Sequence, residues 1–161
     1  MHIGILSDTH SRYQTVEAAL ASLQARNVNF LIHCGDIEDA ETVWLFRGFT
    51  VHFTFGNCDT ERTELRQAIH GIGATLHEGY GCLELDGVKL AFTHGDDRYV
   101  MRDLENADAY DFLFYGHTHK AYEYRAGRTR VINPGALQRA TTKSFLFLDL
   151  PAGTVRAQIL E

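Results

Sequence analysis

The chain has 161 residues, a length that fits one domain, and its 45% hydrophobic content is enough to build a sizeable core. Charged residues make up 22% of the chain, and the formal net charge of -6 argues against a general nucleic-acid binder, which would be basic. No run approaches the ~20 apolar residues of a membrane span, no signal peptide is recognisable, and the three widely spaced cysteines are typical of reduced thiols, so we expect a cytoplasmic protein.

The first predicted strand covers residues 3–6, a short apolar run that breaks at Ser7. Ligands of open α/β sheets bind at the carboxyl ends of the strands, and Asp8 and His10 leave the strand at this end. In extended or loop backbone, a carboxylate and an imidazole two residues apart can point at one centre. Taken alone, a helix cap at Asp8 and a loop residue at His10 are the simpler interpretation, so the assignment depends on the segments that follow.

A helix and a second strand come next. Ser11 and Gln14 have the spacing of a capping box, and apolar residues then recur along one helix face at Val16, Ala19, Leu20 and Leu23. The apolar run 28–34 predicts a strand parallel to the first, because a helix connects the two. This strand ends at Asp36, which brings a second carboxylate to the same edge of the sheet.

The third strand is predicted at residues 49–55, after a helix over residues 40–44 whose apolar side includes Trp44. Apolar and polar residues alternate in this strand, which is the pattern of a strand with one buried face. A short helix around residues 65–69 follows. The segment between strand and helix reads Gly56-Asn57-Cys58-Asp59.

The second half of the chain begins with a predicted hairpin, since residues 82–85 and 88–92 flank Asp86-Gly87, a strong two-residue turn signal. Its second strand runs into His94. The remaining elements are a helix, a buried strand, a strand pair and a hairpin, predicted at residues 100–107, 110–115, 121–132 and 145–160. The buried strand ends in Gly116-His117-Thr118-His119.

The order of these elements predicts a βαβαβ unit with a parallel sheet, followed by a more antiparallel half. Two sheets that pack together with helices on the outside would bury the apolar faces of both. We therefore expect an α/β (α+β) fold of two mixed sheets flanked by helices, in one domain over residues 1–161.

Five segments that each end a predicted strand carry side chains suited to metal binding: Asp8, His10, Asp36, Asn57, His94, His117 and His119. Two carboxylates, one amide and four imidazoles form a mixed set that suits first-row metals such as Mn, Fe, Co, Ni or Zn. Seven ligands are too many for one tetrahedral ion. They suit two ions ~3.5–4 Å apart that share a bridging carboxylate.

Each of these side chains also has a structural interpretation. Asp36 and Asp59 fit helix caps, Asn57 fits a turn, and His94 fits a hydrogen-bonded core histidine. Seven such coincidences in one chain are much rarer than one, because each residue type makes up only a few per cent of proteins. We assign no role to the other five histidines, His2, His33, His52, His70 and His77.

The chain resembles the calcineurin-like metallophosphoesterase superfamily in the motifs that it carries in this order: Asp8-x-His10, Gly35-Asp36, Gly56-Asn57-x-Asp59, His94-Gly95 and Gly116-His117-x-His119. The chain length and the Gly-Asn-Cys-Asp motif are similar to the small single-domain, YfcE-like phosphodiesterase branch. The resemblance spans residues 1–135 and implies a four-layer αββα sandwich with two metal ions. The ligands it implies are Asp8, His10 and His119 for one ion, Asn57, His94 and His117 for the other, and Asp36 as the bridge.

The resemblance also implies a hydrolase of phosphoric ester bonds, and the branch favours a phosphodiesterase. A hydroxide that bridges the two ions would attack the phosphorus in line with the leaving group. We expect manganese as the metal, with nickel, cobalt, iron and zinc as alternatives, and a small phosphate ester as the substrate. Neither general nucleic-acid binding nor membrane attachment is expected, and pairing of exposed edge strands into an oligomer stays open.

Two other functions would use the same residues. A phosphomonoesterase or nucleotidase would bind a dianionic phosphate, with Arg12, Arg98 and Arg102 as candidate cations. A non-catalytic metal-binding scaffold, similar to the retromer subunit of this superfamily, would have part of the ligand set substituted. All seven positions are filled here, which favours an enzyme.

One departure from the family concerns Cys58, which stands where many members have a histidine. In those members the imidazole is thought to protonate the leaving group or to steady the transition state, which a thiol does poorly. We take Cys58 and Asp59 as candidate catalytic residues that lie just behind the ligands. The alternatives are that Cys58 is a small buried residue that fills space, and that Asp59 orients a ligand or caps a helix.

Overall fold

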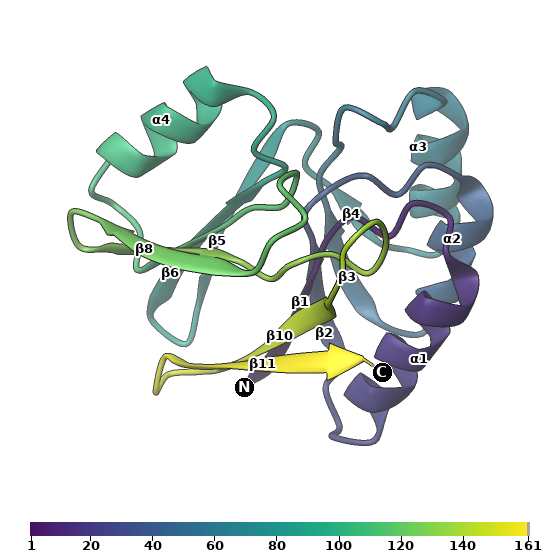
Figure 1. Cartoon of the computed structure of the whole chain (residues 1–161), viewed down its shortest axis with the longest axis horizontal. Coiled ribbons are helices and arrows are strands. Elements are labelled where there is room, and N and C mark those ends of the chain that lie inside the picture. Colours follow the sequence, from purple (N-terminus) through teal and green to yellow (C-terminus); the bar gives the residue numbers. More distant parts are fainter. Residues whose placement is uncertain (161) are drawn as a thin grey trace.

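The computed structural model describes residues 1–160, in which two β-sheets pack face to face between two layers of helices (Figure 1). The first sheet has the strand order β11-β10-β1-β2-β3-β4. Its strands are β1 (His2–Leu6), β2 (Phe30–His33), β3 (Thr50–Phe53), β4 (Thr75–Leu76), β10 (Lys143–Asp149) and β11 (Thr154–Leu160). The second sheet has the strand order β5-β6-β7-β9-β8. Its strands are β5 (Tyr80–Leu85), β6 (Val88–Thr93), β7 (Phe112–Phe114), β8 (Tyr122–Ala126) and β9 (Thr129–Asn133).

Three apolar clusters fill the spaces between the four layers. The first joins the first sheet to its helices, α1 (Tyr13–Gln24), α2 (Ala40–Leu45) and α3 (Arg62–Gly71). The second lies between the sheets and includes Ile3, Ile5, Phe92 and Phe114. The third joins the second sheet to α4 (Arg98–Asn106) through Leu104 (Figure 1). This αββα arrangement confirms the predicted fold class.

The strand pairing follows the connections between strands. β1, β2 and β3 are parallel, as the helices between them predict. In the second sheet the predicted β5–β6 hairpin is confirmed, but β6–β7 and β7–β9 are parallel. The prediction of a more antiparallel second half was wrong for these two central pairs. The reason is that α4 returns the chain from the end of β6 to the start of a parallel β7, and the edge strand β8 returns it from the end of β7 to the start of a parallel β9.

One detail of the predicted helices was wrong. The N-cap of α1 is Arg12 and makes no side-chain cap hydrogen bond, so Ser11 forms no capping box. The Ser11 N–H instead donates to the Ile37 carbonyl at 3.3 Å, because this loop runs beside the β2–α2 loop. The helix predicted over residues 40–44 is confirmed as α2, which turns Val43 toward the core and leaves Trp44 43% exposed. No helix within residues 1–160 combines the length and apolar character that a membrane crossing needs.

Candidate metal centre

The loops that carry the predicted ligands leave the carboxyl ends of neighbouring strands and are hydrogen-bonded to one another. The backbone N–H of His10, in the β1–α1 loop, donates to the carbonyl of Asp36, in the β2–α2 loop, at 3.1 Å. In the second sheet, the Gly116 N–H donates to the His94 carbonyl at 2.8 Å. Both sheets therefore deliver their loops to one place, as the strand-end argument predicts.

Four of the predicted ligands, Asp8, His10, Asp36 and His119, form one cluster in which a ligand atom of each lies within 4.8 Å of the others. The Nε2 atom of His119 lies 3.1 Å from Asp8 Oδ1 and 3.2 Å from His10 Nε2. The Nε2 atom of His10 lies 3.5 Å from Asp36 Oδ2. Two carboxylates and two imidazoles that converge in this way are a donor set for a divalent first-row ion.

The other three predicted ligands lie on a second side of Asp36. The Nε2 atom of His94 is 3.3 Å from Asp36 Oδ2 and 3.1 Å from Asn57 Oδ1. His117 stands beside His94, with the ring centroids 5.1 Å apart. Asp36 Oδ2 therefore faces His94 on one side and His10 on the other, which is the position that a shared carboxylate needs.

Two of the imidazoles are held in one orientation from behind. His10 Nδ1 lies 2.6 Å from Glu38 Oε1, and His94 Nδ1 lies 2.8 Å from the carbonyl oxygen of Cys34. Because those acceptors require an Nδ1–H, the Nε2 atoms that face the centre carry free lone pairs when the rings are neutral. Metal-binding histidines are typically oriented by such a carboxylate or carbonyl.

Backbone strain gathers at this centre. Five of the seven predicted ligands have a left-handed backbone, with φ between 42° and 67°: Asp8, His10, Asp36, His117 and His119. Such conformations are uncommon for residues with a Cβ and are held only where the surroundings fix them. The loop hydrogen bonds therefore aim side chains that a relaxed backbone would direct elsewhere.

Two glycines allow the loops to approach closely. A Cβ on Gly56 would clash with the Asp36 carboxylate, and a Cβ on Gly116 would clash with the Ser7 hydroxyl and with Asp8 Oδ2. Side chains at either position would therefore push the carboxylates out of the centre.

The charges at the centre are unbalanced in a way that a cation would correct. Asp8 is fully buried, and within residues 1–160 its Oδ1 atom has no hydrogen-bond partner. Burial raises the pKa of Asp8 above its ordinary value. Burial also opposes the charge of Asp36, but contacts with His94 outweigh it and hold the pKa of Asp36 well below its usual range. The residues present thus fit a divalent ion, which would give the buried carboxylate oxygen its missing partner.

Asp59 lies behind the ligands and anchors the loop of Asp36. Its buried carboxylate accepts four backbone N–H groups, from Asp36, Ile37, Glu38 and Gly56, at 2.7–3.0 Å. The cap alternatives fail here, because the N-cap of α3 is Glu61 and that of α2 is Asp39. The geometry is that of a residue that positions a loop, and a catalytic role for Asp59 stays a prediction.

Cys58 is half-buried at the edge of the centre. Its backbone N–H donates to Asp36 Oδ1 at 2.8 Å, and its Sγ atom groups with His10 and Glu38 within 4.8 Å. Burial and the Asp36 carboxylate raise the pKa of the Cys58 thiol, so the sulfur is protonated near neutral pH and is a poor nucleophile. A catalytic role for Cys58 also stays a prediction.

The sequence analysis missed two residues that support the ligands. Glu38 reads as an ordinary acid before a helix, yet it holds His10. His33, which was assigned no role, is completely buried at the end of β2. Its Nε2 atom lies 3.1 Å from the hydroxyl of Thr9, the residue between the predicted ligands Asp8 and His10. Burial lowers the pKa of His33 to about 3, so this imidazole is neutral. The only signal for His33 in the sequence is a polar residue inside an apolar run.

Comparison with known proteins places this geometry in one family. The model of the calcineurin-like phosphoesterase superfamily domain matches residues 1–152. The phosphodiesterase MJ0936 of Methanocaldococcus jannaschii is 32% identical over 138 residues, which cover 84% of this chain and 83% of that protein.

Solved structures agree with the sequence comparison. The structure of an archaeal phosphodiesterase has a TM-score of 0.91 at 30% identity, covering 99% of this chain and 100% of that one. YfcE, a phosphoesterase from E. coli, has a TM-score of 0.73 at 20% identity, covering 100% of both chains. At that lower identity the likeness shows the fold alone.

Proposed function

The chain belongs to the calcineurin-like phosphoesterase superfamily, and from this premise we propose that it is a phosphodiesterase that works with two divalent metal ions. The resemblance seen in the sequence is confirmed, and the family is one of phosphoric-ester hydrolases that use divalent metal ions. The observation that carries the proposal is the cluster of Asp8, His10, Asp36 and His119, in which one buried carboxylate oxygen accepts no hydrogen bond within the described chain.

The proposed ligands divide into two sets that share one carboxylate. Asp36 is the shared residue because its Oδ2 atom faces an imidazole of each set. Manganese is the metal we propose, since the mixed oxygen and nitrogen donors suit it. The set for the first ion is Asp8, His10 and His119, and the set for the second is Asn57, His94 and His117.

The proposed reaction is in-line attack of hydroxide on the phosphorus of a diester, with departure of one alcohol. When bound, the two ions supply positive charge for the phosphate oxygens and lower the pKa of water so that hydroxide forms near neutral pH. The two carboxylates offset only part of that charge, so the centre attracts an anionic ester although the chain is acidic. Glu38 and Asp59 keep the His10 ring and the Asp36 loop in place during the reaction.

The named relative and the contacts of nearby arginines support a diester over a monoester. A diester carries one negative charge and a monoester carries nearly two at neutral pH. Arg139, which lies at the rim of the centre, is already paired with Glu38 at 3.2 Å. The guanidinium groups of Arg98 and Arg102 lie over the ring of Tyr99 on α4. Arg98, Arg102 and Arg139 are therefore engaged elsewhere, which leaves Arg12 as the sequence-predicted candidate for a second phosphate charge.

The test is hydrolysis of bis(4-nitrophenyl) phosphate and of 4-nitrophenyl phosphate by metal-stripped protein, with Mn, Ni, Co, Zn and Mg added back singly. We expect metal-dependent turnover that prefers the diester and is abolished in Asp36→Asn and His94→Ala. His70→Ala, an exposed histidine on α3, is the matched control and should behave as the parent. Equal turnover in Asp36→Asn, or no turnover with any metal, would contradict the proposal.

A further inference from the structure

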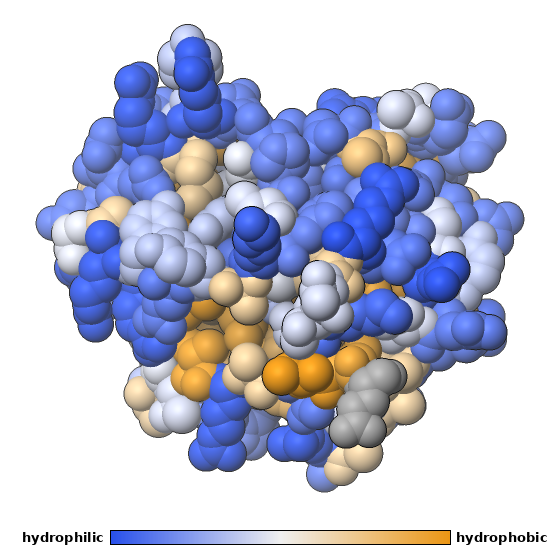
Figure 2. All heavy atoms as spheres, viewed as in Figure 1, coloured by the Kyte–Doolittle hydropathy of each residue, from blue (hydrophilic) through white to orange (hydrophobic). Residues whose placement is uncertain are grey.

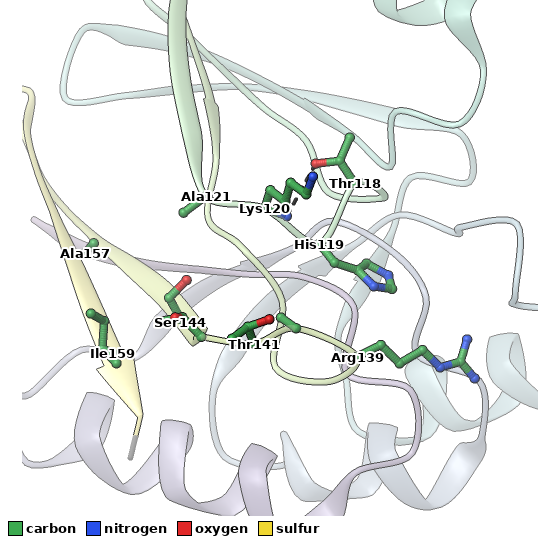
Figure 3. A pocket seen from close by; sticks show the side chains of 11 residues that line it. Thr118, His119, Lys120, Ala121, Arg139, Thr141, Ser144, Ala157 and Ile159 are labelled. Carbon is green, nitrogen blue, oxygen red and sulfur yellow. Dashed lines mark hydrogen bonds between the residues drawn. The ribbon is translucent and has the colours of Figure 1, made fainter.

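A hollow of about 520 Å³ lies beside the metal centre, where β11 and the start of β8 border the loop before β10 (Figure 3). Ala121, Ala157 and Ile159 form its apolar part, and Lys120 and the hydroxyl side chains of Thr141 and Ser144 complete it. Figure 2 shows apolar surface gathered over β10 and β11 on this face. A hollow of this volume is large enough for an organic group.

The hollow and the metal centre share one boundary. His119, a proposed ligand, lines the hollow together with Arg139. Figure 3 shows both side chains directed away from Ala157 and Ile159. His119 contacts Asp8 at the centre, and Arg139 contacts Glu38 beside it. A phosphate at the centre would therefore have one of its ester arms beside the mouth of the hollow.

We propose that this hollow binds one organic arm of the diester, and that the preferred arm is bulky and mainly aromatic or apolar. The proposal rests on the proposed function, because it assumes that the phosphate lies at the metal centre. Burial of the arm against Ala157 and Ile159 would supply affinity that a small alkyl arm lacks. Lys120 at the edge of the hollow adds a positive charge that suits the anionic ester.

The first test uses two diesters with the same leaving group, bis(4-nitrophenyl) phosphate and methyl 4-nitrophenyl phosphate. In the parent protein kcat/KM should favour the bis-aryl ester, and Ala157→Trp, which fills the hollow, should lower that ratio about tenfold. Gln158→Trp is the matched control, because Gln158 lies on the opposite face of β11 and bonds Arg26. If Ala157→Trp keeps the parental ratio of the two kcat/KM values, the hollow does not bind the ester arm and this proposal is wrong. Turnover of both esters would still support the proposed function.

The second test does not depend on turnover. Diphenyl phosphate is titrated into protein with a labelled Ile159 methyl group, and the methyl resonance is followed. We expect a saturable shift in the parent and in Gln158→Trp, and none in Ala157→Trp. Absence of a shift in the parent would overturn the proposal even if diesters are hydrolysed.

A second inference rests on a different observation, a buried imidazole in an apolar environment. His33 is 0% exposed and packs against the rings of Phe46 and Phe53. Its Nδ1 atom is buried and has no hydrogen-bond partner among residues 1–160. A leucine or phenylalanine would fill this space without an unpaired polar atom, so the imidazole is retained at a cost in stability.

The tautomer of His33 follows from its neighbours. The hydroxyl of Thr9 lies 3.3 Å from the Asp36 carbonyl and 3.1 Å from His33 Nε2. A hydroxyl has one proton, which Thr9 donates to the carbonyl, and so Nε2–H donates to the hydroxyl. This assignment leaves a lone pair rather than an N–H group unpaired at Nδ1, and orphaned buried N–H groups are the rarer case.

We infer that His33 is a positioning residue for the metal centre. His33 lies at the end of β2 and bonds Thr9, which belongs to the loop that carries Asp8 and His10. The same Thr9 hydroxyl bonds the backbone of Asp36, so the contact joins both loops. Loss of this connection would release strained ligand positions toward relaxed backbone conformations. The effect would appear in metal affinity before it appears in the fold.

The test is calorimetric titration of Mn²⁺ into metal-stripped variants. His33→Leu and Thr9→Val should each weaken affinity about 10- to 100-fold, and the double variant should be no weaker than either alone. His33→Gln, whose amide can donate in place of Nε2–H, should retain most of the affinity. Phe46→Leu, which disturbs the same core, should lower the melting temperature without changing affinity. Parental affinity in Thr9→Val, or an equal loss in Phe46→Leu, would overturn the inference.

Discussion

Two histidines in this fold, His94 and His52, have opposite acid–base character. At the candidate metal centre, burial opposes the charge of His94, yet the adjacent Asp36 carboxylate raises the pKa of His94 to about 9. On the first sheet, His52 of β3 is hydrogen-bonded to His77, with Nδ1 and Nε2 2.8 Å apart, and its ring stacks on that of Phe30. Burial there lowers the pKa of His52 to about 4.

The comparison shows that partners, more than burial, decide what an imidazole can do here. His94 is the more buried of the two, yet it is the one that favours positive charge, because carboxylates face it. The carboxylate beside His94 favours positive charge there, whether a proton or a metal ion, and burial disfavours it at His52. Substitutions at the metal centre should therefore change metal affinity, and substitutions at His52 should change stability alone.

The largest effect is expected for Asp8→Asn. The change removes a buried negative charge, so metal affinity and diester turnover should fall, turnover by on the order of 10²–10³-fold. The metal-free protein should become more stable, because burial disfavours the charged Asp8 side chain. Urea unfolding of the stripped protein and Mn²⁺ titration measure the two effects. Asp149→Asn is the control, because it changes a carboxylate that pairs with His2 and is not a proposed ligand. A loss of both stability and affinity in Asp8→Asn would contradict the account.

Glu38→Gln should weaken the hold on one ligand without removing it. Glu38 accepts from His10 Nδ1 at 2.6 Å, and an amide there no longer fixes the ring with the same strength. We expect about a tenfold loss in Mn²⁺ affinity. Glu41→Gln, an exposed acid in the first turn of α2, should leave affinity at the parental value. Equal affinities in the two variants would show that the Glu38 contact does not orient His10.

His52→Phe should act on acid stability alone. Because the folded-state pKa of His52 is lowered to about 4 from 6.5, the unfolded chain takes up a proton first as the pH falls. The parent should therefore lose stability between about pH 6.5 and 4, and the variant should lose less, by about 1 kcal/mol at most because the ring is only half-buried. Melting temperatures at pH 7.5 and 4.5 measure this difference. Identical pH profiles would contradict the account, as would a change in Mn²⁺ affinity.

The smallest effect is expected for Cys58→Ser. The raised pKa keeps the thiol protonated. A serine hydroxyl has a similar size, and the hydrogen bond from the backbone N–H of residue 58 to Asp36 does not involve the side chain. Turnover should stay within about threefold of the parent, the range of surface and isosteric changes. Cys58→His is the informative comparison, because it adds the imidazole that the family resemblance implies at this position. It should raise kcat for esters with poor leaving groups, and a large loss in Cys58→Ser would instead show that the thiol takes part in the reaction.

The arrangement of the ligands was predictable because it follows from topology. Parallel strands end at one edge, so residues such as Asp8, Asp36 and Asn57, far apart in the chain, are brought together once the strands are recognised. The residue types then indicate the chemistry, and the layered fold follows from the order of the elements. The layered fold and the convergence of these residues were predicted correctly, because both depend on local pattern and strand order alone. Their roles as metal ligands stay a prediction.

Other features depend on three-dimensional contacts that no local pattern contains. The left-handed backbones of Asp8 and His10 arise from hydrogen bonds to the β2–α2 loop. The contact of His33 with Thr9 depends on the register of β1 and β2. The spacing of apolar residues places Trp44 on the apolar face of its helix. In the structure the short α2 helix leaves part of that face exposed to solvent. Such features require the assembled structure.

The measurement that tests the central claim most directly is the binding stoichiometry of Mn²⁺ on metal-stripped protein, read by metal analysis and by electron paramagnetic resonance. The account predicts two ions per chain with the exchange-coupled signal of ions that share a ligand, and loss of that coupling in Asp36→Asn. One ion per chain, or two ions without coupling in the parent, would contradict a centre built around a shared Asp36.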